Sequence, residues 1–511
     1  MRTVLRRGVA LGASLLAVAS PGADAQMSAA AEGGSSRTLS IVPTLSVNEI
    51  LTDNSRLSSS NKRSELVTTV QPGIRMESIG GRVRGFVDYS LSGVAYARDS
   101  SKSELQNALN ANLKVEAIEN WIFVDASGNI SQQLISPLGT RSTDSSLINN
   151  NQTEVRTFSL SPYIHGQLGT LADYEGRYAQ TWTRNNTNED ANNTTSLVSL
   201  RLNGNSGLRY VSWSVDASHQ VYDYSSGSRT QDDRVRGVLY IGFGPELRFS
   251  LIQGRESNNI ISEQKQSHST TGFGVDWQPS ERTRVSAQSE QRFFGHSHAV
   301  SLEYRTPRSI WRYSDTNDIS TGFGQPNGSR RGTAYDLYFA QLASQQPDPV
   351  LRAALVDEYL RARGILPTQV SDGSLTAGIT RQRRQELSFA LVGIRDSVTL
   401  TASRSQGRRI GSAVSGSVPD DFANDVTQRG VSATLAHRLT ASAALNLVGS
   451  IDRISGVTTS PSTSLRSFTL FWSDQLGMRS SVSLGARRSE FSSPSAPYTE
   501  NALTASLGVR F

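Results

Sequence analysis

Most of the chain after Gln26 alternates apolar residues with polar or small ones, and few segments show the spacing of an amphipathic helix. The clearest case is the stretch from Leu503 to Phe511, where every second residue is apolar and the residues between are Thr, Ser, Gly and Arg. The same alternation runs through residues 211–218 and 445–451. A strand with one face toward lipid and the other toward water has this pattern, but so has a strand of a β-sandwich.

The lengths of the connections favour a membrane barrel, because such barrels have short turns at one end and longer loops at the other. Longer connections separate predicted short turns at 79–82, 119–120, 168–171, 203–207, 244–245, 278–281, 307–308, 395–397, 439–442 and 474–478. One connection, at Gly295 to His298, falls on the long-loop side but is short. The alternation predicts an all-β fold, an antiparallel transmembrane β-barrel of about 22 strands, or about 18 to 20 if some boundaries are misplaced. Both termini should lie on the short-turn side.

Aromatic residues support the same orientation. Trp121, Trp277, Trp311 and Trp472 lie within about five residues of a predicted short turn, as in the aromatic girdle of a membrane barrel. Buried core tryptophans placed by chance would give the same distribution. The final residue, Phe511, resembles the C-terminal signal that the barrel assembly machinery recognises in bacterial outer-membrane proteins.

One segment, residues 332–364, breaks the strand pattern. An Asp-Pro pair at 348–349 is a helix start, and Leu351, Leu355 and Tyr359 then recur every fourth residue. We expect a short amphipathic helical insert on the long-loop side. Its apolar face should pack on the inner wall as a constriction or on the barrel mouth as a lid, unless it is an incidental helix in a surface loop.

The N-terminus has the features of an export signal. Arginines near the start are followed by an apolar stretch from Val9 to Ala19 and by a small-x-small cleavage site ending at Ala25. We expect a signal peptide at 1–25, cleaved near Ala25-Gln26, then a periplasmic segment at 26–38 and the barrel at 39–511. This predicts the outer membrane of a Gram-negative bacterium as the location.

Composition excludes several kinds of chemistry. The chain has no Cys, which excludes disulfides, thiolate metal sites and a cysteine nucleophile. Its mean hydropathy is −0.36, and no apolar run long enough for a membrane helix follows the N-terminus. No nucleotide-binding, hydrolase or metalloprotease motif is present, and His296 and His298 lack a third metal ligand nearby. We therefore predict no catalytic, cofactor-binding or metal site, although a Ser-His or Asp-His site at the rim would leave no local signature.

Charge on the polar face is more informative. With the apolar face of each strand toward lipid, the residues expected to line the lumen are Arg82, Arg84, Arg234, Arg236, Arg248, Arg284, Arg292, Arg438, Arg479, Arg487 and Arg510. Against them stand Asp88, Asp216 and Glu290, which predicts a net positive wall. Guanidinium groups bind carboxylates and phosphates and would concentrate anionic solutes. A general preference for Arg over Lys, combined with an ordinary polar lumen lining, would give the same list of residues. Nucleic acid is disfavoured as a partner, because the protein is expected to be exported.

Short sequence matches extend over the chain from residue 43 onward. They are 43–49 with 52–54, 70–74, 89–96, Asp348–Val350, Arg383-Arg384, Gly393–Arg395 and Leu507–Phe511. On these residues the chain resembles the outer-membrane β-barrel proteins encoded with PEP-CTERM/exosortase and exopolysaccharide systems. The resemblance implies a porin-like barrel in envelope polysaccharide export, and it brings no catalytic residues.

Three functions follow as expectations. The first is a passive conduit or accessory component for exopolysaccharide export, with a possible anionic polysaccharide as cargo. The second is a general anion-preferring porin, and the third is a surface enzyme acting on lipid or polysaccharide. A receptor with a plug domain is disfavoured, because the strand pattern begins near Leu39. Expected partners are outer-membrane lipid, lipopolysaccharide and the barrel assembly machinery.

Overall fold

The computed structural model describes residues 39–187, 192–225, 229–320, 356, 379–410, 425–456, 462–477 and 479–511. The expected signal peptide at 1–25, the segment 26–38 and the helical insert 332–364 apart from Val356 lie outside these residues. The insert's Leu351, Leu355 and Tyr359 are therefore not described, and the role assigned to them stays a prediction.

The described residues form 22 β-strands and one short 3-10 helix. The first eleven strands are β1 (Leu39–Thr52), β2 (Glu65–Ile79), β3 (Val83–Tyr96), β4 (Glu104–Ile118), β5 (Ile122–Leu134), β6 (Gln152–Leu168), β7 (Ala172–Asn185), β8 (Asn193–Asn205), β9 (Val211–Tyr224), β10 (Arg229–Phe243) and β11 (Leu247–Asn258), with the 3-10 helix η1 (Ser100–Lys102) between β3 and β4. The others are β12 (Gln266–Ser280), β13 (Thr283–Arg292), β14 (Gly295–Arg305), β15 (Ser309–Ser320), β16 (Thr380–Val392), β17 (Asp396–Arg409), β18 (Val426–Arg438), β19 (Ala443–Gly456), β20 (Thr463–Gln475), β21 (Ser480–Ser492) and β22 (Tyr498–Arg510). Among the described residues, no helix is long and apolar enough to cross a membrane.

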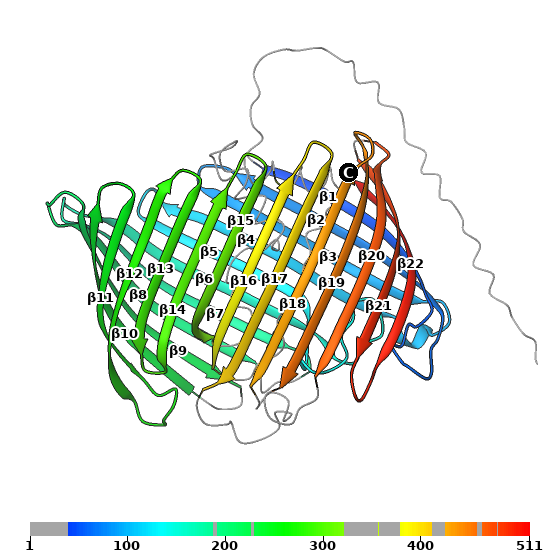
Figure 1. Cartoon of the computed structure of the whole chain (residues 1–511), viewed down its shortest axis with the longest axis horizontal. Coiled ribbons are helices and arrows are strands. Elements are labelled where there is room, and N and C mark those ends of the chain that lie inside the picture. Colours follow the sequence, from blue (N-terminus) through cyan, green and yellow to red (C-terminus); the bar gives the residue numbers. More distant parts are fainter. Residues whose placement is uncertain are drawn as a thin grey trace, which may run out of the picture. The chain divides into compact units, whose positions relative to one another are not determined.

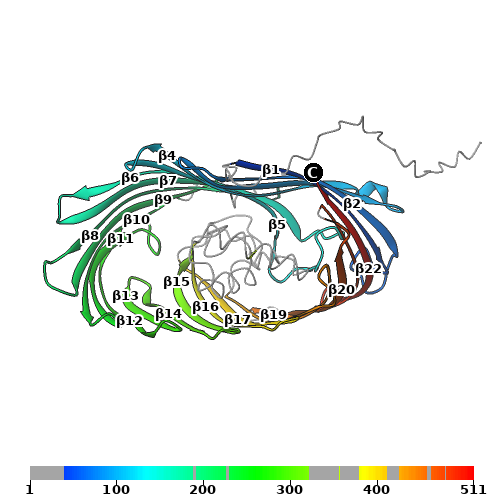
Figure 2. The same ribbon diagram turned by 90° about the horizontal axis from the view of Figure 1, so that it is seen from above.

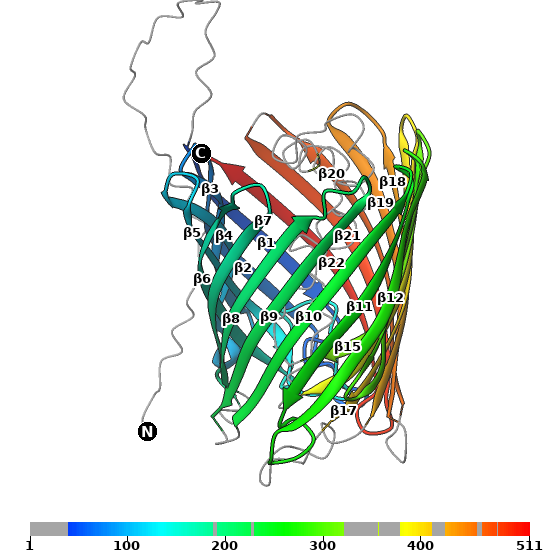
Figure 3. The ribbon, with the colours of Figure 1, turned by 90° about the vertical axis from the view of Figure 1, so that its left-hand side faces the viewer.

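The strands close into one antiparallel barrel, as the sequence predicts (Figures 1 and 3). Each strand pairs with the next along the chain, and β22 pairs with β1 in a register that sets Ala502 opposite Thr52 and Arg510 opposite Thr44. Closure leaves no strand edge unpaired, which is the condition for a sheet to cross lipid. The barrel therefore has the architecture of an outer-membrane protein.

The predicted short turns all lie at, or within a few residues of, connections between consecutive strands on one end of the barrel. Four of them contain left-handed backbone, for example at Asn120 with φ 56° and at Gly244 with φ 77°, a conformation that Asn and Gly tolerate. The connection expected at Gly295 to His298 is indeed short, because only Phe293 and Phe294 join β13 to β14. We call the two ends the short-turn end and the long-loop end.

Alternation along the strands separates an outward face from an inward face. On β10, Val235, Leu239 and Phe243 are 54%, 40% and 64% exposed, as expected of side chains that face lipid. Arg234 and Arg236, between and beside them, point the other way, into the lumen. Directly opposed residues of neighbouring strands share a face, so the strand register identifies the inward-facing and outward-facing residues of every other strand.

The predicted aromatic girdle lies at the short-turn end. Trp121, Trp277 and Trp311 are 47%, 46% and 43% exposed, and all lie close to short turns. At the same end, the amide of Phe511 donates a hydrogen bond to the carbonyl of Pro43 over 3.0 Å. The side chain of Phe511 is 64% exposed and therefore remains accessible.

Candidate functional site in the barrel lumen

The connection between β5 and β6, residues 135–151, folds into the lumen, and we call it the inner loop (Figure 2). Its Arg141 carbonyl accepts a hydrogen bond from Tyr498 Oη over 2.6 Å, and its Ser146 carbonyl accepts one from Tyr96 Oη. These tyrosines stand on β3 and β22, two and five strands away from β5 around the wall. The inner loop therefore crosses the lumen near the long-loop end and narrows it.

An apolar contact anchors the inner loop. Leu147 is 2% exposed and packs with Leu57 of the β1–β2 connection and with Leu465, Phe491 and Tyr498 from the inward face of β20 to β22. Full burial of a leucine side chain stabilises by about 1.5 to 3 kcal/mol. A surface loop rarely buries such a residue, so this contact holds the inner loop against the wall.

Short polar side chains shape the base of the inner loop. Asn151 Nδ2 donates to the Ser136 carbonyl over 2.8 Å and to the Thr140 carbonyl over 3.0 Å, while the Ser136 amide donates to Asn151 Oδ1 over 2.8 Å. Asp144 Oδ1 accepts the Ser146 amide over 3.0 Å. Asn, Asp and Ser favour such turns because their side chains replace missing backbone partners. The loop thus carries its own fold into the lumen.

A buried ion pair fixes the far side of the inner loop. Arg487 on β21 lies 2.8 Å from Asp144 of the loop and 2.8 Å from Glu500 on β22. The side chains of Arg487 and Glu500 are 8% and 1% exposed. Burial opposes ionisation of Asp144, but the charge and hydrogen bond of Arg487 and the hydrogen bonds from Ser146 outweigh it and hold the pKa of Asp144 below its ordinary value. The loop is therefore attached through a charged group at neutral pH.

A second charged network lies on the inward face of β10, β11, β13 and β15. Arg292 lies 2.9 Å from Glu256 and 2.7 Å from Asp318, and Glu256 also accepts the Phe293 amide over 2.6 Å. On the same face Arg234 and Arg236 lie 2.5 Å and 2.6 Å from the two carboxylate oxygens of Glu290. This network is a compensated cluster, in which each guanidinium has a carboxylate.

The structure places the eleven predicted lumen arginines in three different parts of the barrel. Arg234, Arg236 and Arg292 come together around Glu256 and Glu290, and Arg487 stands alone at the inner loop. The remaining seven gather toward the short-turn end: Arg82 and Arg479 in turns, and Arg84, Arg248, Arg284, Arg438 and Arg510 at inward strand positions. They do not converge on one site.

Sequence reasoning missed the carboxylates that pair with Arg248, Arg292 and Arg487. Glu256, Asp318, Glu500 and Asp144 pair with Arg292 and Arg487, and Asp276 lies 2.8 Å from Arg248. The expected net positive wall counted only Asp88, Asp216 and Glu290. The five paired arginines contribute less positive charge to the wall than expected, and the net charge of the whole wall stays a prediction. Asp144 lies in one of the longer connections, which the sequence pattern places at the long-loop end, although the apolar Leu147-Ile148 pair in that connection is a signal for burial.

The candidate metal ligands and the insert provide no further site among the described residues. Among the described residues, no group of three or more His, Cys, Asp or Glu is arranged to hold a metal ion. His296 and His298 contact separate partners, Gln291 and Asp315. In the insert, Val356 is helical and buried.

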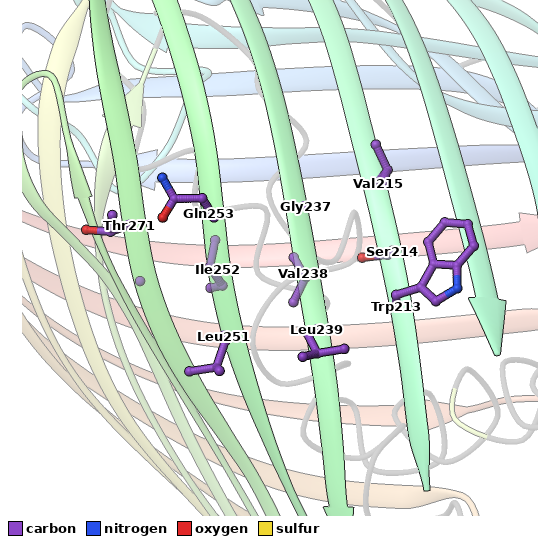
Figure 4. A pocket seen from close by; sticks show the side chains of 11 residues that line it. Trp213, Ser214, Val215, Gly237, Val238, Leu239, Leu251, Ile252, Gln253 and Thr271 are labelled. Atoms are coloured by element: carbon purple, nitrogen blue, oxygen red, sulfur yellow. The ribbon is translucent and has the colours of Figure 1, made fainter. Parts of the chain in front are cut away.

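A shallow groove crosses β9 to β12 on the outward face (Figure 4). It dips at Gly237, which has no side chain, and Trp213, Leu239 and Leu251 lie along it. Its outward lining contains no titratable group, so it is a lipid-facing depression rather than a reactive site.

Comparisons with known proteins give structural likeness only. No protein-family model matches the chain, and no curated protein matches it. Among solved structures, it is similar to the siderophore receptor PirA from Pseudomonas aeruginosa, with 9% identity over 92% of this chain and 80% of that one and a TM-score of 0.45. A mutant of the ferric enterobactin receptor PfeA from the same organism has 10% identity over 92% and 80%, with a TM-score of 0.48. The FrpB iron transporter from Neisseria meningitidis, F5-1 variant, has 10% identity over 92% and 82%, with a TM-score of 0.49.

Proposed function

We propose that the protein is an outer-membrane conduit and that its cargo is an exopolysaccharide. The observation that carries the conduit is the inner loop, which is built as a constriction: it folds by its own turns, buries Leu147 and is charge-paired through Asp144. Barrels of this size need an internal obstruction to be selective, because an open lumen of many strands would leak small solutes. The resemblance to barrels encoded with exopolysaccharide systems suggests the cargo.

The inward wall of β17 to β22 suits a chain of sugars. Hydroxyl groups meet across neighbouring strands as Thr401–Ser432, Ser450–Ser467 and Ser483–Ser506 pairs. All six residues alternate with exposed apolar residues such as Leu400, Val431 and Phe468, and none is fully buried, so their hydroxyls face the lumen. A hydroxyl both donates and accepts hydrogen bonds, which lets it exchange partners with a sliding polyol at little net cost.

The charge pairing favours this proposal over the anion-preferring porin. Arg292 and Arg487 each hold a buried carboxylate, whose negative charge cancels most of the positive potential that the guanidinium would present to small anions.

Gene deletion in the native host tests the cargo. We expect the deletion strain to lose surface exopolysaccharide while polymer collects in the periplasm, and the wild-type gene to restore export. Liposome swelling with purified protein serves as the second arm, with small anions compared against neutral sugars of equal size. Normal export by the deletion strain, together with faster uptake of the anions, would overturn the proposal in favour of the porin.

A further inference from the structure

Five exposed arginines form a row on the outward face of five consecutive strands. The row consists of Arg404 on β17, Arg429 on β18, Arg453 on β19, Arg466 on β20 and Arg488 on β21. Each is the first outward residue beyond the apolar positions on the long-loop side: Val431, Ile451 and Phe468, which are 59%, 54% and 53% exposed, lie two positions away from their arginines. Figure 1 shows these strands side by side.

The row sets like charges against each other. Arg404 stands directly opposite Arg429, and Arg429 directly opposite Arg453. Directly opposed like charges destabilise a sheet. Within the described part of the chain, Arg404, Arg429, Arg453 and Arg466 have no carboxylate within ion-pairing distance. Glu490 of β21 stands opposite Arg466, so the charge repulsion that no described carboxylate relieves is that among Arg404, Arg429 and Arg453.

Several other outward-facing charged residues near the long-loop end have a partner of opposite charge. Arg383 on β16 binds Asp315 with two hydrogen bonds of 3.1 Å and 2.7 Å. Arg156 on β6 lies 2.6 Å from Glu154, and Asp233 on β10 accepts from Lys265 over 2.6 Å. In the row, by contrast, three arginines stand opposed in succession beside the apolar band.

From this arrangement we infer that the row binds the phosphate groups of outer-leaflet glycolipid. Long loops of such barrels face outward, so the row lies at the level where the acyl chains of the outer leaflet meet their headgroups. A guanidinium binds phosphate through paired N–H donors, and an anion shared by two opposed arginines turns their repulsion into attraction. The acyl chains of the same lipid would cover Val431, Ile451 and Phe468 below.

Lipid binding to the full-length barrel tests the inference directly. The probe is bisphosphorylated lipid A, added to purified protein in neutral detergent and counted by native mass spectrometry; the same lipid without phosphates is the comparison. The test variant combines Arg404→Gln, Arg429→Gln and Arg453→Gln, which keeps size and polarity. The matched control combines Arg156→Gln, Arg229→Gln and Arg255→Gln, the same charge change at exposed outward positions on β6, β10 and β11, where no two of the three residues are opposed.

We expect the test variant to lose lipid A binding several-fold while the control variant binds as the wild type does, and dephosphorylated lipid to bind all three weakly. Removal of the repulsion should leave the barrel folded, as judged by heat-modifiable migration in gel electrophoresis. Equal lipid A binding by both variants would overturn the inference. So would a test variant that keeps lipid A but loses retention of an anionic polysaccharide, because the row would then recognise polymer.

Discussion

Arg487 on β21 donates a hydrogen bond to Asp144 of the inner loop over 2.8 Å, although 343 positions separate the two residues in the sequence. The same guanidinium holds Glu500 of β22, so one side chain joins the wall to the constriction. An arginine between two carboxylates, nearly enclosed, is costly to disturb in either direction. The contact holds the constriction together with the Leu147 cluster and the hydrogen bonds from Tyr96 and Tyr498.

Removal of the guanidinium should release the inner loop. We expect Arg487→Met to raise single-channel conductance and to lower the free energy of unfolding by about 3 to 5 kcal/mol, because two carboxylates lose their partner in a buried place. Planar-bilayer recording and urea unfolding in detergent measure the two effects. Arg255→Met on β11, an exposed outward arginine, is the control and should change neither.

Acid should release the same contact. The depressed pKa of Asp144 means that its contribution to stability is complete above the ordinary aspartate value of about 4 and disappears as the pH falls through the depressed value. Conductance should therefore be steady between pH 7 and about pH 5 and rise only in stronger acid. Asp144→Asn should show the raised conductance already at pH 7. A wild-type rise centred near pH 6 would point to a different titrating group.

The alternation of the sequence was enough to predict the strands, their number and the short turns, because lipid on one side and water on the other impose a period of two on every strand. It also set nine of the eleven predicted arginines at inward strand positions, whereas Arg82 and Arg479 lie in turns. The ion pairs could not be predicted from the sequence. Asp144 meets Arg487, and Glu256 meets Arg292, because of how the barrel closes and where a loop runs, and no local pattern encodes either. The length of the connection at 135–151 likewise predicts only that it lies at the long-loop end, and does not show that it folds into the lumen.

Loss of the final residue should impair assembly. The Phe511 amide pairs with Pro43 at the seam between β22 and β1, and its ring is exposed for recognition. We expect a chain that ends at Arg510 to accumulate in the periplasm, whereas Phe511→Tyr should assemble normally. Fractionation with heat-modifiability gels follows both. Wild-type amounts of folded truncated barrel in the outer membrane would contradict a role in assembly.

The insert at 332–364 tests the remaining prediction about a constriction. Ser320 at the end of β15 pairs directly with Thr380 at the start of β16, so the flanking strands are held without the intervening chain. Replacing 332–364 with a Gly-Ser linker should leave the barrel folded, because halving or doubling a loop changes its closure free energy by about 0.6 kcal/mol. If Leu351, Leu355 and Tyr359 hold a helix against the lumen wall, conductance rises; unchanged conductance with reduced export would favour a lid.

The conduit account depends most directly on the conductance of a barrel without its inner loop. Replacing residues 138–149 with a short Gly-Ser linker keeps Ser136 and Asn151, whose mutual hydrogen bonds close the base of the loop. With folding checked by heat-modifiable migration, single-channel recording in planar bilayers should show a conductance several-fold above that of the wild type, and larger neutral sugars should pass. A folded variant with wild-type conductance would contradict the claim that this loop sets the width of the lumen.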